Sequence, residues 1–101
     1  MWLFPNAEVD ANETPEAAVA RALFGAVGLR GRATGLLCVV RHTVTRFRIT
    51  LDAYRTSVSG GVAKALTVSE CAWKEPEELQ NLAMPNAHRR IATALLDDER
   101  K

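Results

Sequence analysis

The feature that most constrains the fold is a strict alternation of apolar and polar side chains over positions 46–54. Such period-two alternation is typical of a β-strand with one buried face and one polar face. We therefore expect a strand here whose two faces differ in chemistry. The face turned toward a core carries Phe47, Ile49, Leu51 and Ala53, and the opposite, largely basic face carries Arg46, Arg48, Thr50, Asp52 and Tyr54.

A second strand is predicted just before the first. The run from Leu36 to Val40 is apolar at every position, which is typical of a strand that is buried on both faces. We expect a turn at residues 43–45 to join the two strands and to project beyond the sheet. Glycine-rich segments predict a loop at residues 31–35 and a turn at residues 57–61.

Two helices are predicted by their end signals and by their apolar periodicity. The first helix is expected to begin near residue 15. Thr14 supplies a capping hydroxyl, Pro15 suits the first helical position, and Glu16 places a carboxylate near the positive end of the helix dipole. Gly28 is well placed to end this helix. The second helix begins at Pro85 and Asn86, after a short helical turn over residues 76–79. The expected buried stripes are Ala18, Val19, Ala22, Leu23 and Ala26 in the first helix, and Ala87, Ile91, Ala94 and Leu95 in the second.

Short strands at residues 2–4 and 66–73 complete an expected order of strand, helix, three strands and helix. This order predicts an α+β fold in which two helices pack on one sheet. The length of 101 residues fits a single domain that spans residues 1–101.

The charges are unevenly distributed along the chain. The net charge is +1, but residues 30–64 carry an excess of +6, while residues 1–29 carry −3 and residues 65–101 carry −2. Six of the seven basic residues in the central segment are arginines, the side chain that binds phosphate through two parallel hydrogen bonds. The segment therefore predicts an anionic partner, with a solvated strand face as the alternative.

Several classes of protein and site are excluded by composition. No apolar run approaches the ~18 residues of a membrane span, and residues 1–6 lack the pattern of a secretory signal. We therefore expect a soluble, cytoplasmic protein without a membrane partner. Two cysteines and two histidines are present, but none of them has the spacing of a zinc site, so we expect buried free cysteines and no metal. These four residues are Cys38, Cys71, His42 and His88.

A spaced set of residues between Ala7 and Leu29 resembles the Nudix box, the signature of hydrolases that act on nucleoside diphosphate derivatives. The positions that match the frame of the box are Glu13, Arg21, Leu23, Gly28 and Leu29. The three glutamates in the second half of the box are replaced by Ala22, Gly25 and Ala26, which share one face of the helix. Glutamates there would supply the oxygen ligands that Mg²⁺ requires, and these side chains have none. We therefore expect no metal and no catalytic residue in this segment. Glu13, Arg21 and Gly28 are expected to serve as scaffold, with Glu13 paired to Arg21.

Three further stretches resemble the C-terminal domain of A/G-specific adenine DNA glycosylases. They are Trp2-Leu3-Phe4-Pro5, the segment from Val40 to Phe47, and the segment from Ala83 to Ile91. Together with the box, they place the resemblance along nearly the whole chain and in the correct order. The resemblance implies a degenerate Nudix-like domain with a mixed sheet, which carries out no hydrolysis and serves base excision DNA repair.

In that family the domain recognises 8-oxoguanine opposite the adenine that a separate N-terminal domain excises. The residues that the resemblance implies for DNA and lesion binding are Arg41, His42, Val44, Thr45, Arg46 and Arg48. The family carries Phe-Ser-His where this chain has Val44, Thr45 and Arg46. Thr45 keeps a hydroxyl that can bond a base edge or a phosphate, Val44 lacks an aromatic ring, and Arg46 can bind phosphate or stack on a base. His42 matches an earlier family histidine, whereas residues 88–90 are expected to form a capping and solvated cluster.

The implied partners are double-stranded DNA, bound weakly by the domain alone, and a glycosylase catalytic domain, with no cofactor in this chain. The family domain has strand material before the position of Trp2. The chain is therefore expected to be a fragment of a longer enzyme, or a domain whose open sheet edge promotes self-association.

Two alternatives belong to other functional classes. A divergent Nudix hydrolase would use carboxylates outside the helix face to hold its metal, namely Glu8, Asp10, Glu13 or Glu16. A stand-alone interaction module would pair with a partner strand through the sheet edge.

Overall fold

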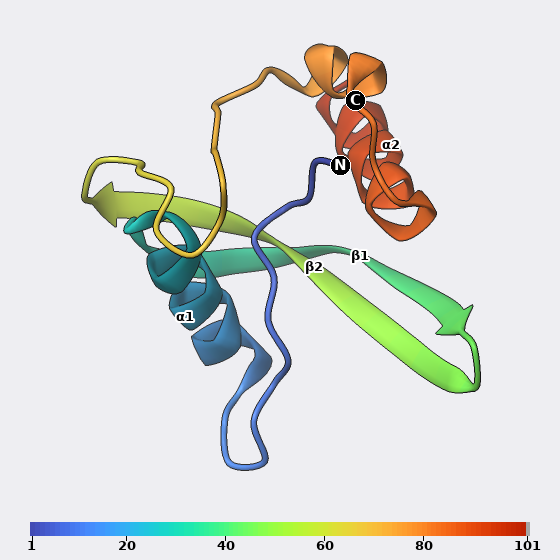
Figure 1. Cartoon of the computed structure of the whole chain (residues 1–101), viewed down its shortest axis with the longest axis horizontal. Coiled ribbons are helices and arrows are strands. Elements are labelled where there is room, and N and C mark those ends of the chain that lie inside the picture. Colours follow the sequence, from blue (N-terminus) through green and yellow to red (C-terminus); the bar gives the residue numbers. More distant parts are fainter. Residues whose placement is uncertain (101) are drawn as a thin grey trace. The chain divides into compact units, whose positions relative to one another are not determined.

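The computed structural model describes residues 1–100 and shows an α+β fold, as the sequence predicts. Helix α1 (Pro15–Val27) precedes the strands β1 (Arg30–Val44) and β2 (Phe47–Gly60). The short 3-10 helix η1 (Pro76–Asn81) and helix α2 (Asn86–Glu99) follow (Figure 1). Within residues 1–100, no helix combines the length and apolar character needed to cross a membrane.

Local signals define both ends of α1, in agreement with the sequence. The Thr14 hydroxyl accepts a hydrogen bond from the Ala17 N–H at 3.1 Å, and proline occupies the first turn. Gly28 ends the helix in the left-handed region at φ 75°, and its N–H donates to the Phe24 carbonyl at 2.9 Å. A residue with a Cβ would be strained at this φ, so glycine is required at the end of the helix.

The sheet is an antiparallel hairpin of β1 and β2, joined by a turn at Thr45 and Arg46. Both strands are longer than predicted, because residues 31–35 and 57–60 lie in strands rather than in a loop and a turn. A Cβ on Gly31 would lie 2.7 Å from the Ser57 carbonyl oxygen. The glycine therefore permits a close approach within the hairpin, and the prediction of a loop there was wrong.

The predicted strands at 2–4 and 66–73 are absent from the described chain, because their polar groups bond elsewhere. The Trp2 N–H donates to the Ala83 carbonyl at 2.8 Å. The Leu66 N–H donates to the Ala26 carbonyl at 3.0 Å, and the Thr67 hydroxyl donates to the Gly25 carbonyl at 3.3 Å. A contact between two loops and a loop against α1 therefore replace the outer strands expected of a mixed sheet.

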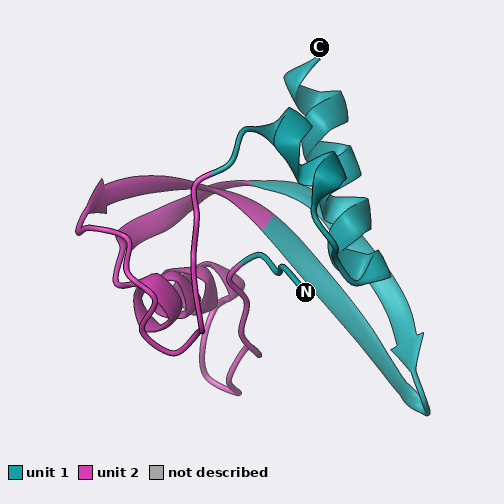
Figure 2. Cartoon of the chain, turned by 45° about the horizontal axis from the view of Figure 1, so that its top comes forward, with its two compact units in different colours: residues 1–4, 36–53, 74–101 teal, residues 5–35, 54–73 magenta. Residues whose placement is uncertain are grey.

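The chain divides into two compact units, which β1 and β2 both pass through (Figure 2). Unit 1 comprises residues 1–4, 36–53 and 74–101, and unit 2 comprises residues 5–35 and 54–73. Unit 2 holds α1 and buries Ala18, Val27 and Leu29. The core of unit 1 is formed by Val40, Ala87 and Ile91, with Phe4, Leu37, Cys38, Leu51 and Ala53 packed against them.

The hairpin is buried only along part of its length in unit 1. Leu51 and Ala53 pack against the core, as predicted. Phe47 and Ile49 were also predicted to be buried, but they are 68% and 37% exposed. The alternation correctly assigns these side chains to one face, but the end of the hairpin extends past the residues that cover that face.

Candidate functional site

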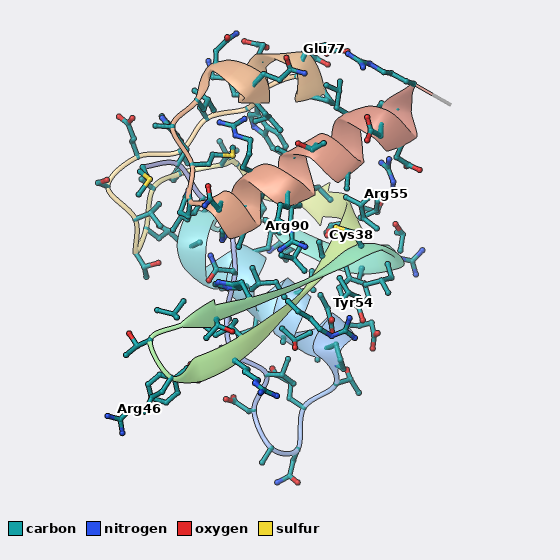
Figure 3. All side chains as sticks on the ribbon, turned by 90° about the vertical axis from the view of Figure 1, so that its right-hand side faces the viewer. Cys38, Arg46, Tyr54, Arg55, Glu77 and Arg90 are labelled. Carbon is teal, nitrogen blue, oxygen red and sulfur yellow. The ribbon has the colours of Figure 1, made fainter. Side chains whose placement is uncertain are left out.

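The end of the hairpin, within unit 1, brings together most of the residues that the sequence singles out. Arg41, Arg46 and Arg48 are all exposed, and Arg46 projects from the turn (Figure 3). Cys38 and Val40 on β1 face the core, as do Leu51 and Ala53 on β2. Because side chains alternate along a strand, Arg41 and Arg48 lie on the face opposite that core.

A shallow hollow of about 210 Å³ lies on this part of the hairpin. It is lined by Arg41, His42, Thr43, Arg48, Ile49 and Thr50. Alternation places Arg41, Thr43, Arg48 and Thr50 on the face opposite the core and His42 on the face of Val40, and the lining includes no carboxylate. This is the chemistry of an anion site, since guanidinium and hydroxyl groups donate hydrogen bonds to phosphate oxygens.

Sequence reasoning missed Thr43, Ile49 and Thr50 as lining residues of the hollow. Threonine is common on exposed strand faces, so its presence alone carries no functional signal. The signal available in the sequence was positional. Thr43 is two residues from Arg41, and Thr50 is two residues from Arg48, so each threonine shares a strand face with an arginine.

The hairpin turn contains a strained residue, Thr45, at φ 57°. A β-branched residue in the left-handed region is an outlier, because its Cβ approaches the backbone too closely. Val44 and Phe47 flank the turn and are 48% and 68% exposed. The turn therefore presents a hydroxyl, an arginine and two apolar side chains at the far end of the hairpin.

The two histidines differ in burial and in contacts. His42 lines the hollow, whereas His88 on α2 is only 8% exposed. The Nδ1 atom of His88 accepts a hydrogen bond from the Phe4 N–H at 3.1 Å. The two rings stack with their centroids 5.9 Å apart. Burial, with a smaller effect from the charge of His42, holds the pKa of His88 below 6.5.

The expectation that residues 88–90 form a capping and solvated cluster was wrong for His88. His88 is buried, and the Arg89 guanidinium donates to the carbonyls of Leu79 and Leu82, which ties η1 to α2. Arg90 is exposed, and its Nη1 donates to the Arg41 carbonyl at 3.2 Å. The two cysteines are half-buried free thiols rather than fully buried ones.

The frame of the Nudix box, in unit 2, is held by an ion pair. Arg21 donates to both carboxylate oxygens of Glu13 at 2.8 and 2.9 Å, and to the Glu8 carbonyl at 2.6 Å. The Asp10 carboxylate lies 3.7 Å from the same guanidinium. The hydrogen bonds from Arg21 and from the Asp10 N–H lower the pKa of Glu13 to about 2. These carboxylates thus serve the scaffold of the loop before α1.

Taken together, the fold and the site define a small α+β domain with a Nudix-type loop and helix and a basic hairpin. A comparison with protein families agrees, since the model of the NUDIX domain family matches residues 1–94. The chain therefore belongs to the NUDIX domain family. A search of curated proteins found no match.

The metal chemistry of this family requires oxygen ligands that α1 does not provide at the matching positions of the box. Ala22, Gly25 and Ala26 occupy the ligand positions and have no side-chain oxygen. Among residues 1–100, no three His, Cys, Asp or Glu side chains gather where they could hold a metal ion. Glu13 and Asp10 face a guanidinium instead. The residues present do not fit a hydrolytic Mg²⁺ centre.

Proposed function

We propose that this NUDIX domain does not hydrolyse nucleotides and binds double-stranded DNA through the end of its hairpin. In this role it is the lesion-recognition domain of an enzyme of the adenine DNA glycosylase type. The observation that carries the proposal is the hollow lined by Arg41 and Arg48, which is rich in donors and lacks a carboxylate. The arginine excess of the central segment points the same way.

The positions of the arginines suggest how the hairpin would contact a duplex. Arg41 and Arg48 share one face and can bind backbone phosphates, while Arg46 reaches out from the turn. Phosphate contacts fix the position of a protein on DNA, whereas contacts to base edges read the sequence. We assign the first role to the hollow and the second to the turn.

The turn offers two kinds of contact to a base. The hydroxyl of Thr45 can bond a base edge, and the exposed ring of Phe47 can stack on a base. The strain at φ 57° supports a functional role for Thr45, because strained residues cluster at binding sites. We propose that Thr45 contributes to discrimination between 8-oxoguanine and guanine.

A stand-alone interaction module is the second candidate. It is favoured by Leu36 and Val39 in unit 1, which are exposed apolar side chains on β1, in a sheet that has two strands within residues 1–100. A catalytic glycosylase domain could cover these residues, so the two candidates are compatible. They differ in whether the isolated chain binds duplex DNA in a salt-dependent manner.

The test is fluorescence anisotropy with a short duplex containing 8-oxoguanine opposite adenine, measured over a series of salt concentrations. Each lost phosphate contact lowers the slope of log affinity against log salt by about one. We expect this loss in Arg41→Ala and Arg48→Ala. Arg32→Ala is the matched control, because it removes an exposed arginine of β1 in unit 2. Unchanged slopes in both hairpin variants, or an equal loss in the control, would contradict the proposal.

Base reading is tested on the same duplex with guanine in place of 8-oxoguanine. Arg46→Ala should weaken binding to both duplexes equally, whereas Thr45→Ala should act mainly on the ratio of the two affinities. An unchanged ratio of the two affinities in Thr45→Ala would show that Thr45 takes no part in lesion recognition.

A further inference from the structure

The outer edge of β2 has no partner strand within residues 1–100. The sheet in this part of the chain consists of β1 and β2, so each strand has one open edge. Among the same residues, no backbone hydrogen bond joins positions 47–53 to a segment outside the hairpin. An open edge presents unpaired N–H and C=O groups that can template a further strand. We propose that a second copy of this chain pairs with β2, antiparallel, about a two-fold axis at Thr50.

Symmetry restricts the register of such a pair. Two identical strands that join antiparallel by their edges are related by an axis normal to the sheet, which keeps each face of the sheet on its own side. One residue then lies opposite its own copy, and residues equally distant from it lie opposite each other. The central residue therefore determines every cross-strand pair.

The charges of the two strands favour Thr50 as the central residue. Asp52 is the only acidic residue in β1 and β2, and it forms no ion pair within residues 1–100. With Thr50 at the axis, Asp52 of each copy lies opposite Arg48 of the other, and opposite charges in this position stabilise a sheet. Arg55, the other arginine of β2, is three positions from Asp52 and lies on the other face. β1 offers no such pair, because it contains arginines and no carboxylate.

The same register covers apolar side chains that a single copy leaves exposed. Leu51 and Ala53 pack against the core of unit 1, whereas Phe47 and Ile49 on the same face are 68% and 37% exposed. With the axis at Thr50, Ile49 lies opposite Leu51 of the second copy, and Phe47 lies opposite Ala53 of the second copy. Each exposed side chain gains an apolar neighbour, and its burial favours association. Both faces of β2 thus favour the same register.

The test is sedimentation velocity of the whole chain over a range of concentrations, without DNA. We expect a reversible dimer for the unmodified chain. Asp52→Arg and Arg48→Asp each replace two opposite-charge pairs by two like-charge pairs, so each should raise the dissociation constant of the dimer by about tenfold or more. The two variants mixed in equal amounts should form a heterodimer, because both pairs then join opposite charges again.

The matched controls make the same changes of charge away from the proposed interface. Arg32→Asp and Glu70→Arg both alter exposed residues of unit 2, and both should dimerise like the unmodified chain. Circular dichroism checks that every variant is folded. An unmodified chain that stays monomeric at all concentrations overturns the inference. An equal loss of dimer in the controls, or a mixture of the folded Asp52→Arg and Arg48→Asp variants that stays monomeric, also overturns it.

A second measurement needs no variant and tests the register directly. In a mixture of ¹³C-labelled and unlabelled chains, an isotope-filtered NOE spectrum reports only contacts between copies. We expect contacts between the methyl groups of Ile49 and Leu51, and between the ring of Phe47 and the methyl group of Ala53. Contacts between copies that involve other surfaces and omit these residues overturn the inference.

This inference goes beyond the proposed function and does not depend on it. Asp52 does not line the hollow, so Asp52→Arg tests self-association without altering the lining of the hollow. Dimerisation of a chain that fails to bind duplex supports the inference and overturns the DNA function. Salt-dependent duplex binding by a chain that stays monomeric at all concentrations does the reverse.

Discussion

Replacement of the turn residue Thr45 by glycine should stabilise the fold and impair recognition. Thr45 has φ 57°, and the left-handed region costs an L-residue about 1–2 kcal/mol relative to glycine. Within residues 1–100, its hydroxyl makes no hydrogen bond that would offset this cost. Glycine increases the chain entropy of the unfolded state, which removes about 0.5–1 kcal/mol of the gain. We therefore expect Thr45→Gly to raise the free energy of unfolding by about 0.5–1 kcal/mol.

The assay is chemical denaturation followed by circular dichroism, with a thermal scan as a second measure. A gain of this size raises Tm by about 2–8 °C in a domain of this length. Thr50→Gly is the matched control, because Thr50 lies within β2, where glycine weakens the strand. The control should lose stability. Equal destabilisation of Thr45→Gly and Thr50→Gly would refute the argument that the turn is strained.

Three further predictions follow from the fold. Gly25→Ala should stabilise α1 by about 1 kcal/mol, since a Cβ there meets no atom within 4 Å. Gly28→Ala should instead lower the free energy of unfolding by about 1–2 kcal/mol, because residue 28 has φ 75°. Urea denaturation of both variants measures the two opposite changes in stability. Because the pKa of His88 is lowered in the folded state, its contribution to stability is present above pH 6.5 and is lost as the pH falls below that value. Unfolding measured at pH 7.5 and 5.5 should show this loss for the unmodified chain and a smaller one for His88→Gln. The contribution of Glu13 is present above its ordinary value of 4.5 and is lost as the pH falls toward about 2. An NMR titration of its carboxyl carbon should give a midpoint near 2, which returns toward 4.5 in Arg21→Ala.

Elements set by local signals were predictable from the sequence. Helix α1 follows from Thr14, Pro15 and Gly28, whose effects act within one or two turns of the helix. The two strands were predictable from alternation and apolar runs, but their lengths were not. Gly31 predicted a loop by its local preference, and the approach of Ser57 across the hairpin gives it a different role.

Features set by distant contacts were not predictable in this way. The burial of His88 depends on Phe4, which lies 84 residues away in sequence. The exposure of Phe47 depends on where the cover of the hairpin face ends, which alternation does not specify. At the candidate site, the sequence identified the charged residues of the hairpin. The threonines that complete the hollow had only a positional signal in the sequence, and the pairing of the two strands shows that they line one hollow.

The box positions that lack glutamate and the exposed arginines of the hairpin lie in different parts of the chain. Ala22, Gly25 and Ala26 lie in unit 2, whereas Arg41, Arg46 and Arg48 lie in unit 1. Glu13 and Arg21 still hold the loop before α1 in place through their ion pair. This arrangement is consistent with a domain that keeps the helix as a scaffold and binds its ligand elsewhere.

The central claim is that the hairpin end, and not the Nudix helix, binds the ligand. Backbone NMR of the ¹⁵N-labelled chain, titrated with the duplex that carries 8-oxoguanine opposite adenine, tests it most directly. The account predicts that the largest chemical shift changes fall on residues 41–50 and that residues 13–28 change little. Changes concentrated on residues 13–28, with residues 41–50 unaffected, would contradict it.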